Sequence, residues 1–144
     1  MTTMYERILL PTDGSENAER AIEQAIGLAT TYDASLHLLY VVDVNHMSSD
    51  TAENLMHDKL EQTGHAAVDE IADRAQQAGI TVSSAVIPGT PAQEILTYAE
   101  DHDIDLIVMG TRGRTGFNRL LVGSVTEKVV RLSDIPVLTV PMEN

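Results

Sequence analysis

The feature that most constrains the fold of this chain is its alternation of short apolar runs with longer segments of helical periodicity. The apolar runs cover residues 5–11, 35–42, 81–87, 106–109 and 136–140. They are continuous apolar runs, which is typical of strands buried on both faces of a parallel sheet. The segments between them are predicted helices at 16–32, 51–78, 91–101 and 124–132. The alternation predicts a three-layer α/β fold, Rossmann-like, with helices on both faces of a five-stranded parallel sheet.

Local signals mark several of the predicted helix ends. Ser15 is a favoured N-cap residue for the first helix, and Thr90-Pro91 places an N-cap residue before a proline at the first helical position. Gly79 suits the left-handed position that closes the second helix. The polar region 43–51 is expected to be a mobile loop. No repeat or linker interrupts the pattern, so residues 1–144 are predicted to form one domain.

Composition excludes several classes of protein. The chain has no cysteine, which excludes disulfides, thiol catalysis and cysteine-ligated metal centres. It has one Phe and no Trp, so the 43% of residues that are hydrophobic must form a largely aliphatic core. No apolar run approaches the roughly 20 residues that span a bilayer, and the N-terminus does not resemble a secretory leader. We therefore expect a cytoplasmic protein that does not enter membranes.

The chain is strongly acidic. Its 22 acidic and 9 basic residues give a net charge of −13, which predicts that it binds neither nucleic acid nor anionic lipid, because both are polyanions. An acid-rich, lysine-poor composition is also typical of proteins from high-salt cytoplasm. That halophilic hypothesis predicts a melting temperature that rises in molar KCl, and an unchanged one would contradict it.

A glycine-rich segment after the fourth predicted strand carries the clearest functional signal. Glycines stand at 110, 113, 116 and 123, and hydroxyl residues follow at Ser124 and Thr126, where the last helix is predicted to begin. A strand, a glycine-rich turn and a helix N-terminus together present backbone N–H groups to an anion. Gly110, Gly113 and Gly123 can adopt positive φ, and their lack of a Cβ atom allows phosphate to approach closely. The segment predicts phosphate binding.

Charge supports this interpretation. Residues 106–126 contain Arg112, Arg114 and Arg119 and no acid, so this window is cationic within an acidic chain. Cations in such a window suit an anionic ligand. The alternative is that three arginines simply decorate an exposed loop.

A second polar turn is predicted to lie beside the glycine-rich one. If the strand order is 3-2-1-4-5, the winding direction reverses between the first and fourth strands, and ligands bind at such a switch point. Asp13 in the first turn is suited to ribose hydroxyls or to Mg²⁺ on the nucleotide, or alternatively to capping the first helix. Val41 and Val42 offer an apolar wall to a base, or alternatively pack in the core.

Known catalytic motifs are absent from the sequence. There is no P-loop, no G-x-G-x-x-G after the first strand and no G-x-S-x-G nucleophile turn. The histidines show no metal-ligand spacing and are interpreted as surface or hydrogen-bonded residues; they are His37, His46, His57, His65 and His102. We expect a protein that holds a nucleotide and is not an enzyme, although slow ATP hydrolysis is left open.

The chain resembles the universal stress protein family. The family's ATP-binding signature, G-x2-G-x9-G-[S/T], is matched by Gly110, Gly113 and Gly123-Ser124, and the likeness extends through ILLPTDGS, LHLLYVVD, DLIVMGTRGRTG and IPVLTV. The resemblance implies an adenine nucleotide alpha hydrolase-like fold, ATP as ligand, a regulatory role under stress, and a homodimer through the last strand, Pro136 to Val140.

Together, the residues and the resemblance predict one nucleotide site. It comprises Pro11, Thr12, Asp13, Ser15, Val41, Val42, Met109, Gly110, Arg112, Gly113, Gly123, Ser124, Val125 and Thr126. ATP with Mg²⁺ is the predicted cofactor, with the metal near Asp13. The alternatives are a slow ATPase or related nucleotide-processing enzyme, and a dimeric scaffold that functions without nucleotide.

Overall fold

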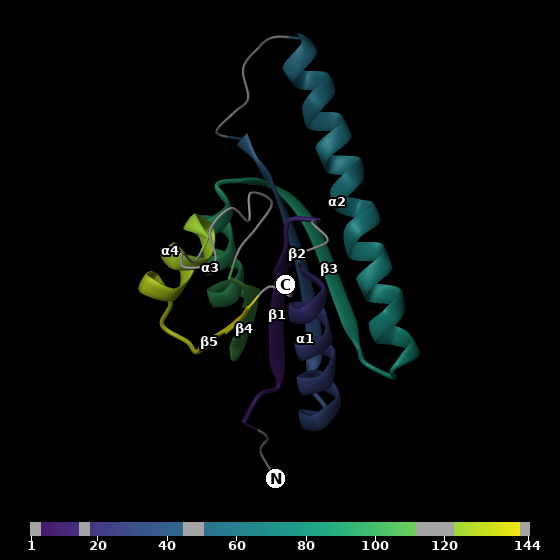
Figure 1. Cartoon of the computed structure of the whole chain (residues 1–144), viewed down its shortest axis with the longest axis vertical. Helices are drawn as coiled ribbons and strands as arrows, with labels where there is room; N and C mark the ends of the chain where they lie inside the picture. The colour runs from purple at the N-terminus through teal and green to yellow at the C-terminus, as the bar shows by residue number, and fades with distance from the viewer. Residues whose placement is uncertain (1–3, 15–17, 45–50, 112–122, 142–144) are drawn as a thin grey trace.

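A computed structural model describes residues 4–14, 18–44, 51–111 and 123–141, with the backbone alone for 51–57 (Figure 1). The described strands form one parallel sheet of five, in the order β3-β2-β1-β4-β5. They are β1 (Arg7–Thr12), β2 (Ser35–Asp43), β3 (Val82–Gly89), β4 (Leu106–Gly110) and β5 (Val137–Val140). The helices between them are α1 (Glu19–Tyr32), α2 (Thr51–Gln77), α3 (Pro91–Asp101) and α4 (Ser124–Leu132). The predicted fold class and strand order are confirmed.

The helices form two outer layers. Helices α1 and α2 cover one face of the sheet, and α3 and α4 cover the other (Figure 1). Neighbouring residues of β1 point to opposite cores: Ile8 and Leu10 pack under α1 and α2, whereas Leu9 packs under α3 and α4. All three side chains are almost fully buried. Because both faces are covered, the strand sequences are continuous apolar runs.

Helix ends follow the sequence signals in part. Helix α2 ends at Gln77, and Gly79 adopts the left-handed φ of +82° that was predicted for it. Helix α3 begins at Pro91 after Thr90, but Thr90 makes no side-chain cap hydrogen bond. Helix α1 begins at Glu19 rather than at residue 16. Its N-cap position is Ala18, which has no side-chain acceptor, while Ser15 lies outside the described residues.

Strand ends differ from prediction where pairing extends them. Strands β2 and β3 continue to Asp43 and Gly89 because these two residues pair with each other in the parallel ladder. Strand β1 begins at Arg7 and passes through Pro11 to Thr12, which pairs with Tyr40 of β2. Residue propensity and hydrophobic periodicity do not predict this register, because it depends on pairing with the neighbouring strand.

Helix α2 is the longest element, with 27 residues. It packs along β2 and β3, and its N-terminal part projects beyond the sheet (Figure 1). Within the described residues, no helix is both long and apolar enough to cross a membrane.

Candidate functional site

The site region lies where the carboxyl ends of β1, β2 and β4 meet. The crossover after β1 leads to β2 on one side, and β4 lies on the other side of β1, so the winding reverses between β1 and β4. The β1–β4 ladder ends at Leu9–Ile107, whereas β1 stays paired with β2 as far as Thr12–Tyr40. Strands β1 and β4 therefore part near their carboxyl ends. This is the crevice position in which ligands bind to open parallel sheets.

The first half of the site is the turn after β1. The Thr12 Oγ1 accepts a hydrogen bond from the N–H of Gly14 at 3.1 Å, which closes a short turn around Asp13. Gly14 has φ of +77°, a conformation that favours glycine. Pro11, Thr12 and Asp13 are half-buried, so the turn is partly open to ligand.

The second half joins the end of β4 to the start of α4. The Thr111 carbonyl accepts a hydrogen bond from the N–H of Gly123. The Thr126 hydroxyl donates to the Gly110 carbonyl at 2.8 Å. These two contacts connect the residues on either side of 112–122, which lie outside the described residues. The N-terminus of α4 is therefore held against the carboxyl end of β4.

The N-terminus of α4 is suited to an anion. Its N-cap residue is Gly123, which has no side chain to cover the first turn. The first amide groups of a helix have no partner within the helix, and the helix dipole is positive there. Ser124 is exposed and adds a hydroxyl donor beside these amides. The arrangement can hold phosphate oxygens without a lysine.

Two of these glycines do not use the positive φ that glycine permits. Gly123 has φ of −57° and ψ of 150°, which any residue adopts, because it occupies an N-cap position. Gly110 is an ordinary strand residue and has no positive φ, since it pairs with Val140 of β5. Any requirement for glycine at these two positions therefore rests on the absence of a side chain. Gly113 lies outside the described residues.

Burial separates the predicted site residues. Val42 and Met109 are 2% and 6% exposed and pack in the two cores, so their side chains do not line an open surface. Val41 and Val125 are half-buried at the margin of the α3–α4 core. Thr126 is 5% exposed, and its hydroxyl proton is directed to Gly110. Thr126 therefore lies between α4 and β4 and links these two elements of the site.

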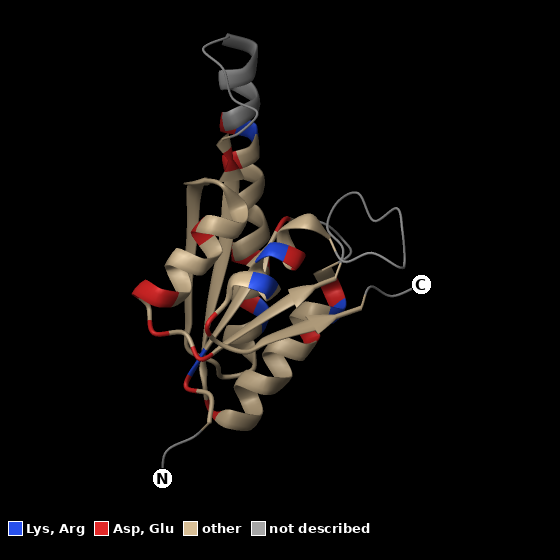
Figure 2. Cartoon of the chain, turned by 90° about the vertical axis from the view of Figure 1, so that its left-hand side faces the viewer, with Lys and Arg blue, Asp and Glu red and all other residues tan. Residues whose placement is uncertain are grey.

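Arg112, Arg114 and Arg119, which form the cationic part of the prediction, lie outside the described residues, as do Ser15 and Gly113. Among the residues after this segment, Glu127 in the first turn of α4 pairs with Arg131 at 2.9 Å. Elsewhere, acidic positions are spread over helices and turns, with few basic ones between them (Figure 2). The described surface is therefore acidic, as the composition predicts.

Sequence reasoning did not single out Gly14 and Thr111. Gly14 closes the Asp13 turn, and its signal was its place after a Thr-Asp pair, which is typical of turns with a left-handed glycine. Thr111 acts through its backbone carbonyl, which receives the Gly123 N–H. No side-chain pattern reveals a backbone contact of this kind.

A hollow of about 380 Å³ lies behind the Asp13 turn, between α1 and α2. Thr12 and Gly14 contribute to its wall, as do Glu19 and Arg74. The Arg74 Nη1 donates to the Glu19 Oε2 at 2.9 Å, and this hydrogen bond raises the pKa of Arg74. The ion pair links α2 to the first turn of α1.

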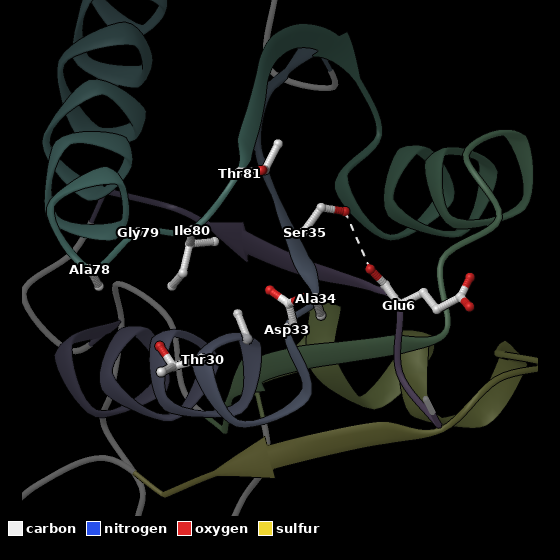
Figure 3. A pocket seen from close by; sticks show the side chains of 10 residues that line it. Glu6, Thr30, Asp33, Ala34, Ser35, Ala78, Gly79, Ile80 and Thr81 are labelled. Atoms are coloured by element: carbon white, nitrogen blue, oxygen red, sulfur yellow. Dashed lines mark hydrogen bonds between the residues drawn. The ribbon is translucent and has the colours of Figure 1, made fainter. Parts of the chain in front are cut away.

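A second hollow, of about 420 Å³, lies at the opposite end of the sheet (Figure 3). It is bounded by the segments that follow α1 and α2, and Figure 3 shows Asp33, Ser35 and Thr81 around it, with the Glu6 carboxylate turned away. Ser35 opens β2, so this hollow is at the amino ends of the strands. It is separate from the predicted nucleotide site.

The described histidines fit the interpretation given to them. His37 is half-buried, and its Nδ1 lies 2.8 Å from the Tyr98 hydroxyl. His102 stacks on the Tyr98 ring with centroids 3.7 Å apart, and His65 is exposed. Within the described part of the chain, no group of three or more histidine or acidic side chains could hold a metal ion.

Comparison with known proteins places this geometry in context. The model of the universal stress protein family matches residues 4–141. Universal stress protein MJ0531 of Methanocaldococcus jannaschii is 39% identical over 140 residues, covering 95% of this chain and 82% of that protein. A solved structure of MJ0577 from the same organism superposes with a TM-score of 0.88 at 36% identity, covering 98% of this chain and 99% of that chain. A universal stress protein solved in complex with cAMP superposes with a TM-score of 0.77 at 27% identity, covering 98% of this chain and 100% of that chain.

The fold and the site define a doubly wound α/β protein with polar turns at the carboxyl ends of β1 and β4, on either side of its switch point. The family model covers nearly all of the sequence. This chain belongs to the universal stress protein family.

Proposed function

We propose that this protein binds ATP with Mg²⁺ at the carboxyl ends of β1 and β4 and that the bound nucleotide regulates its action in the stress response. The observation that carries the proposal is the N-terminus of α4, which has Gly123 as its N-cap residue and is tied to β4 by the Gly110–Thr126 and Thr111–Gly123 hydrogen bonds. The topology places the Asp13 turn on the other side of the switch point. A relative solved with cAMP supports an adenine nucleotide as the class of ligand.

Each part of the nucleotide has a proposed partner. The amides of Ser124 and Val125 and the Ser124 hydroxyl hold phosphate oxygens at the positive end of α4. Gly110 and Gly123 leave room for them. Asp13 receives the ribose hydroxyls, or reaches the phosphates through Mg²⁺. Val41, half-buried at the end of β2, borders the base. Arg112 and Gly113 complete the phosphate contacts in this proposal.

Binding without rapid turnover is the second part of the proposal. The sequence has no P-loop lysine, and Glu127, the acid in the first turn of α4, is paired with Arg131. The nucleotide therefore acts as a ligand whose binding energy favours one state of the protein. Single-turnover release of inorganic phosphate from ATP tests this part, and release within seconds would contradict it.

The partner that we propose is a second copy of this chain in the cytoplasm. Strand β5 is an edge strand, and Leu138 on it is 37% exposed. Val130 and Leu132 of α4 are 49% and 54% exposed. Unpaired strand edges with apolar neighbours favour pairing with another chain.

Calorimetric titration tests the binding proposal. Wild-type protein titrated with ATP and Mg²⁺ is expected to give a saturable heat. Gly123→Val should weaken ATP binding by about tenfold or more, because a branched side chain then stands at the helix N-terminus where phosphate approaches. The backbone at position 123 accepts valine, so the variant is expected to fold.

The matched control is Gly27→Val in α1, because a Cβ atom there meets nothing within 4 Å outside its own turn of helix. Adenosine should be less affected than ATP by Gly123→Val, since it has no phosphate. A wild-type titration without heat change, repeated with the same result at a second temperature, would refute the binding proposal. If folded Gly123→Val bound ATP with the affinity of wild type, the phosphate site would have to lie elsewhere.

A further inference from the structure

The Asp13 turn rests on a buried aromatic ring. Tyr40 lies on β2 directly beside Thr12 of β1 in the parallel ladder. It is 4% exposed and belongs to the core under α1 and α2. Tyr40 therefore occupies the space between the end of β1 and helix α2.

One side of the Tyr40 ring lies against Gly64 of α2. A Cβ atom built on Gly64 would lie 2.5 Å from Tyr40 Cδ1 and 2.9 Å from both Cε1 and Cγ. Real Cβ atoms do not approach ring atoms so closely. Helix α2 can approach β2 at this point because residue 64 has no side chain.

The other edge of the ring lies under Gly14. A Cβ built on Gly14 would lie 3.4 Å from Tyr40 Cε2, an ordinary packing distance. The same point is 3.8 Å from Thr63 Cγ2 and from Ala67 Cβ, both on α2. Gly14 is thus supported from below by Tyr40 and by one face of α2. Its N–H is held by Thr12, and Asp13 lies between these two residues.

We infer that Tyr40 and Gly64 are positioning residues for the Asp13 turn: the ring, seated on Gly64, sets how far the turn stands from α2. The consequence for nucleotide binding rests on the proposed function. A side chain at 64 would push the ring toward Gly14 and displace Asp13 from the nucleoside. The ring itself carries the effect, because ring carbons of Tyr40 are the atoms that face Gly14 and Gly64.

The test is Gly64→Ala, with Gly27→Ala as the matched control. Both replace a helical glycine by alanine, but a Cβ at position 27 meets nothing within 4 Å. Gly64→Ala is expected to weaken ATP and adenosine by the same factor, about tenfold, because the displaced turn contacts the nucleoside shared by both. Gly27→Ala should bind both ligands as wild type does. The melting temperature of Gly64→Ala is the control for folding. Equal losses of ATP and adenosine affinity in a variant that melts near the wild-type temperature are not explained by a general loss of structure.

Two variants of Tyr40 separate the ring from its hydroxyl. Tyr40→Phe keeps the ring and is expected to retain wild-type affinity for adenosine. Tyr40→Leu removes the support without adding an atom, and it should weaken adenosine as Gly64→Ala does. This variant also decides the question if Gly64→Ala does not fold. Wild-type affinity in both Gly64→Ala and Tyr40→Leu would overturn the inference.

A readout without ligand keeps this inference separate from the proposed function. The Gly14 amide donates to Thr12 in the wild type, so its hydrogen exchange, followed by NMR, should accelerate in Gly64→Ala and not in Gly27→Ala. If wild-type protein binds neither ATP nor adenosine, the proposed function fails, while the Gly14 exchange still decides the positioning role. Unchanged exchange in Gly64→Ala would overturn that role.

Discussion

Three glycines near the site serve three different purposes. Gly14 has φ of +77°, so its backbone conformation favours glycine. Gly64 has no positive φ, but the Tyr40 ring occupies the place of its side chain. Gly123 has an ordinary backbone conformation and places no side chain at the α4 N-terminus. A glycine signature in a sequence therefore does not say which of these requirements applies.

The surroundings of the single residue His37 predict that the stability of the protein depends on pH. Burial lowers the pKa of His37 below its ordinary 6.5, and the positive charges of His102 and Arg7 lower it further. The unfolded chain therefore takes up a proton as the pH falls below about 6.5, while the folded chain resists it. The free energy of unfolding should decrease over this range and continue to decrease down to the folded-state pKa.

The measurement is urea denaturation at pH 7.5 and pH 5.5, for wild type and for His37→Gln. The variant cannot titrate at this position, so it should lose less stability than wild type over the same interval. The difference between the two losses of unfolding free energy cancels the contribution of the carboxylates, which both proteins share. Parallel losses in the two proteins would show that His37 is not the source.

At the scale of elements, a side-chain hydrogen bond joins α4 to β4. Thr126 is 5% exposed and donates to the Gly110 carbonyl at 2.8 Å. Thr126→Val keeps the shape and removes the donor, leaving the carbonyl of half-buried Gly110 without this partner. We expect a loss of about 1–2 kcal/mol in the free energy of unfolding, together with weaker ATP binding, because the α4 N-terminus is then less firmly placed.

Thr97→Val is the control for this change. Thr97 is exposed on α3, and a surface substitution of this kind usually changes stability by less than about 0.5 kcal/mol. Chemical denaturation gives the two values under identical conditions. If Thr126→Val and Thr97→Val proved equally stable, the Gly110 contact would contribute nothing to stability.

Element positions also show where sequence reasoning succeeds. The start of α4 at Ser124 and the start of α3 at Pro91 are as predicted, because glycine, proline and the onset of apolar periodicity mark them locally. The start of α1 and the ends of β2 and β3 are not. Helix α1 begins after Ala18, a residue with no capping side chain to mark the position in the sequence. The ends of β2 and β3 depend on the pairing of Asp43 with Gly89.

For the whole molecule, the proposed dimer has a direct test. Leu138 on the edge strand β5 is 37% exposed, and Leu138→Lys places a charge on that edge. Charged residues at strand edges oppose pairing with another chain. Sedimentation velocity is expected to show a dimer for wild type and a monomer for the variant.

Val44→Lys is the matched control for the dimer. Val44 is 36% exposed and follows β2, which β1 and β4 separate from β5 in the sheet. This variant should sediment as wild type does. A dimer that survives Leu138→Lys, or a monomeric wild type, would contradict pairing through β5.

The sequence by itself determined the fold class and the location of the polar turns. Continuous apolar runs, helical periodicity and glycines after strands are local signals that predict a parallel sheet covered by helices. The strand order 3-2-1-4-5, which entered the sequence reasoning as a condition, is confirmed by the structure. The sequence also marked Asp13 and the Gly123-Ser124 pair as site candidates, which the topology brings to the same end of the sheet.

Only the tertiary structure decided what each residue contacts. The Thr126 hydroxyl donates a hydrogen bond to the Gly110 carbonyl. The side chains of Val42 and Met109 are buried in the two cores, and the Tyr40 ring separates Gly14 from Gly64. These contacts join residues from different elements, and their distances depend on how closely a helix approaches a strand. Side-chain packing sets that approach, and no local pattern in the sequence encodes it.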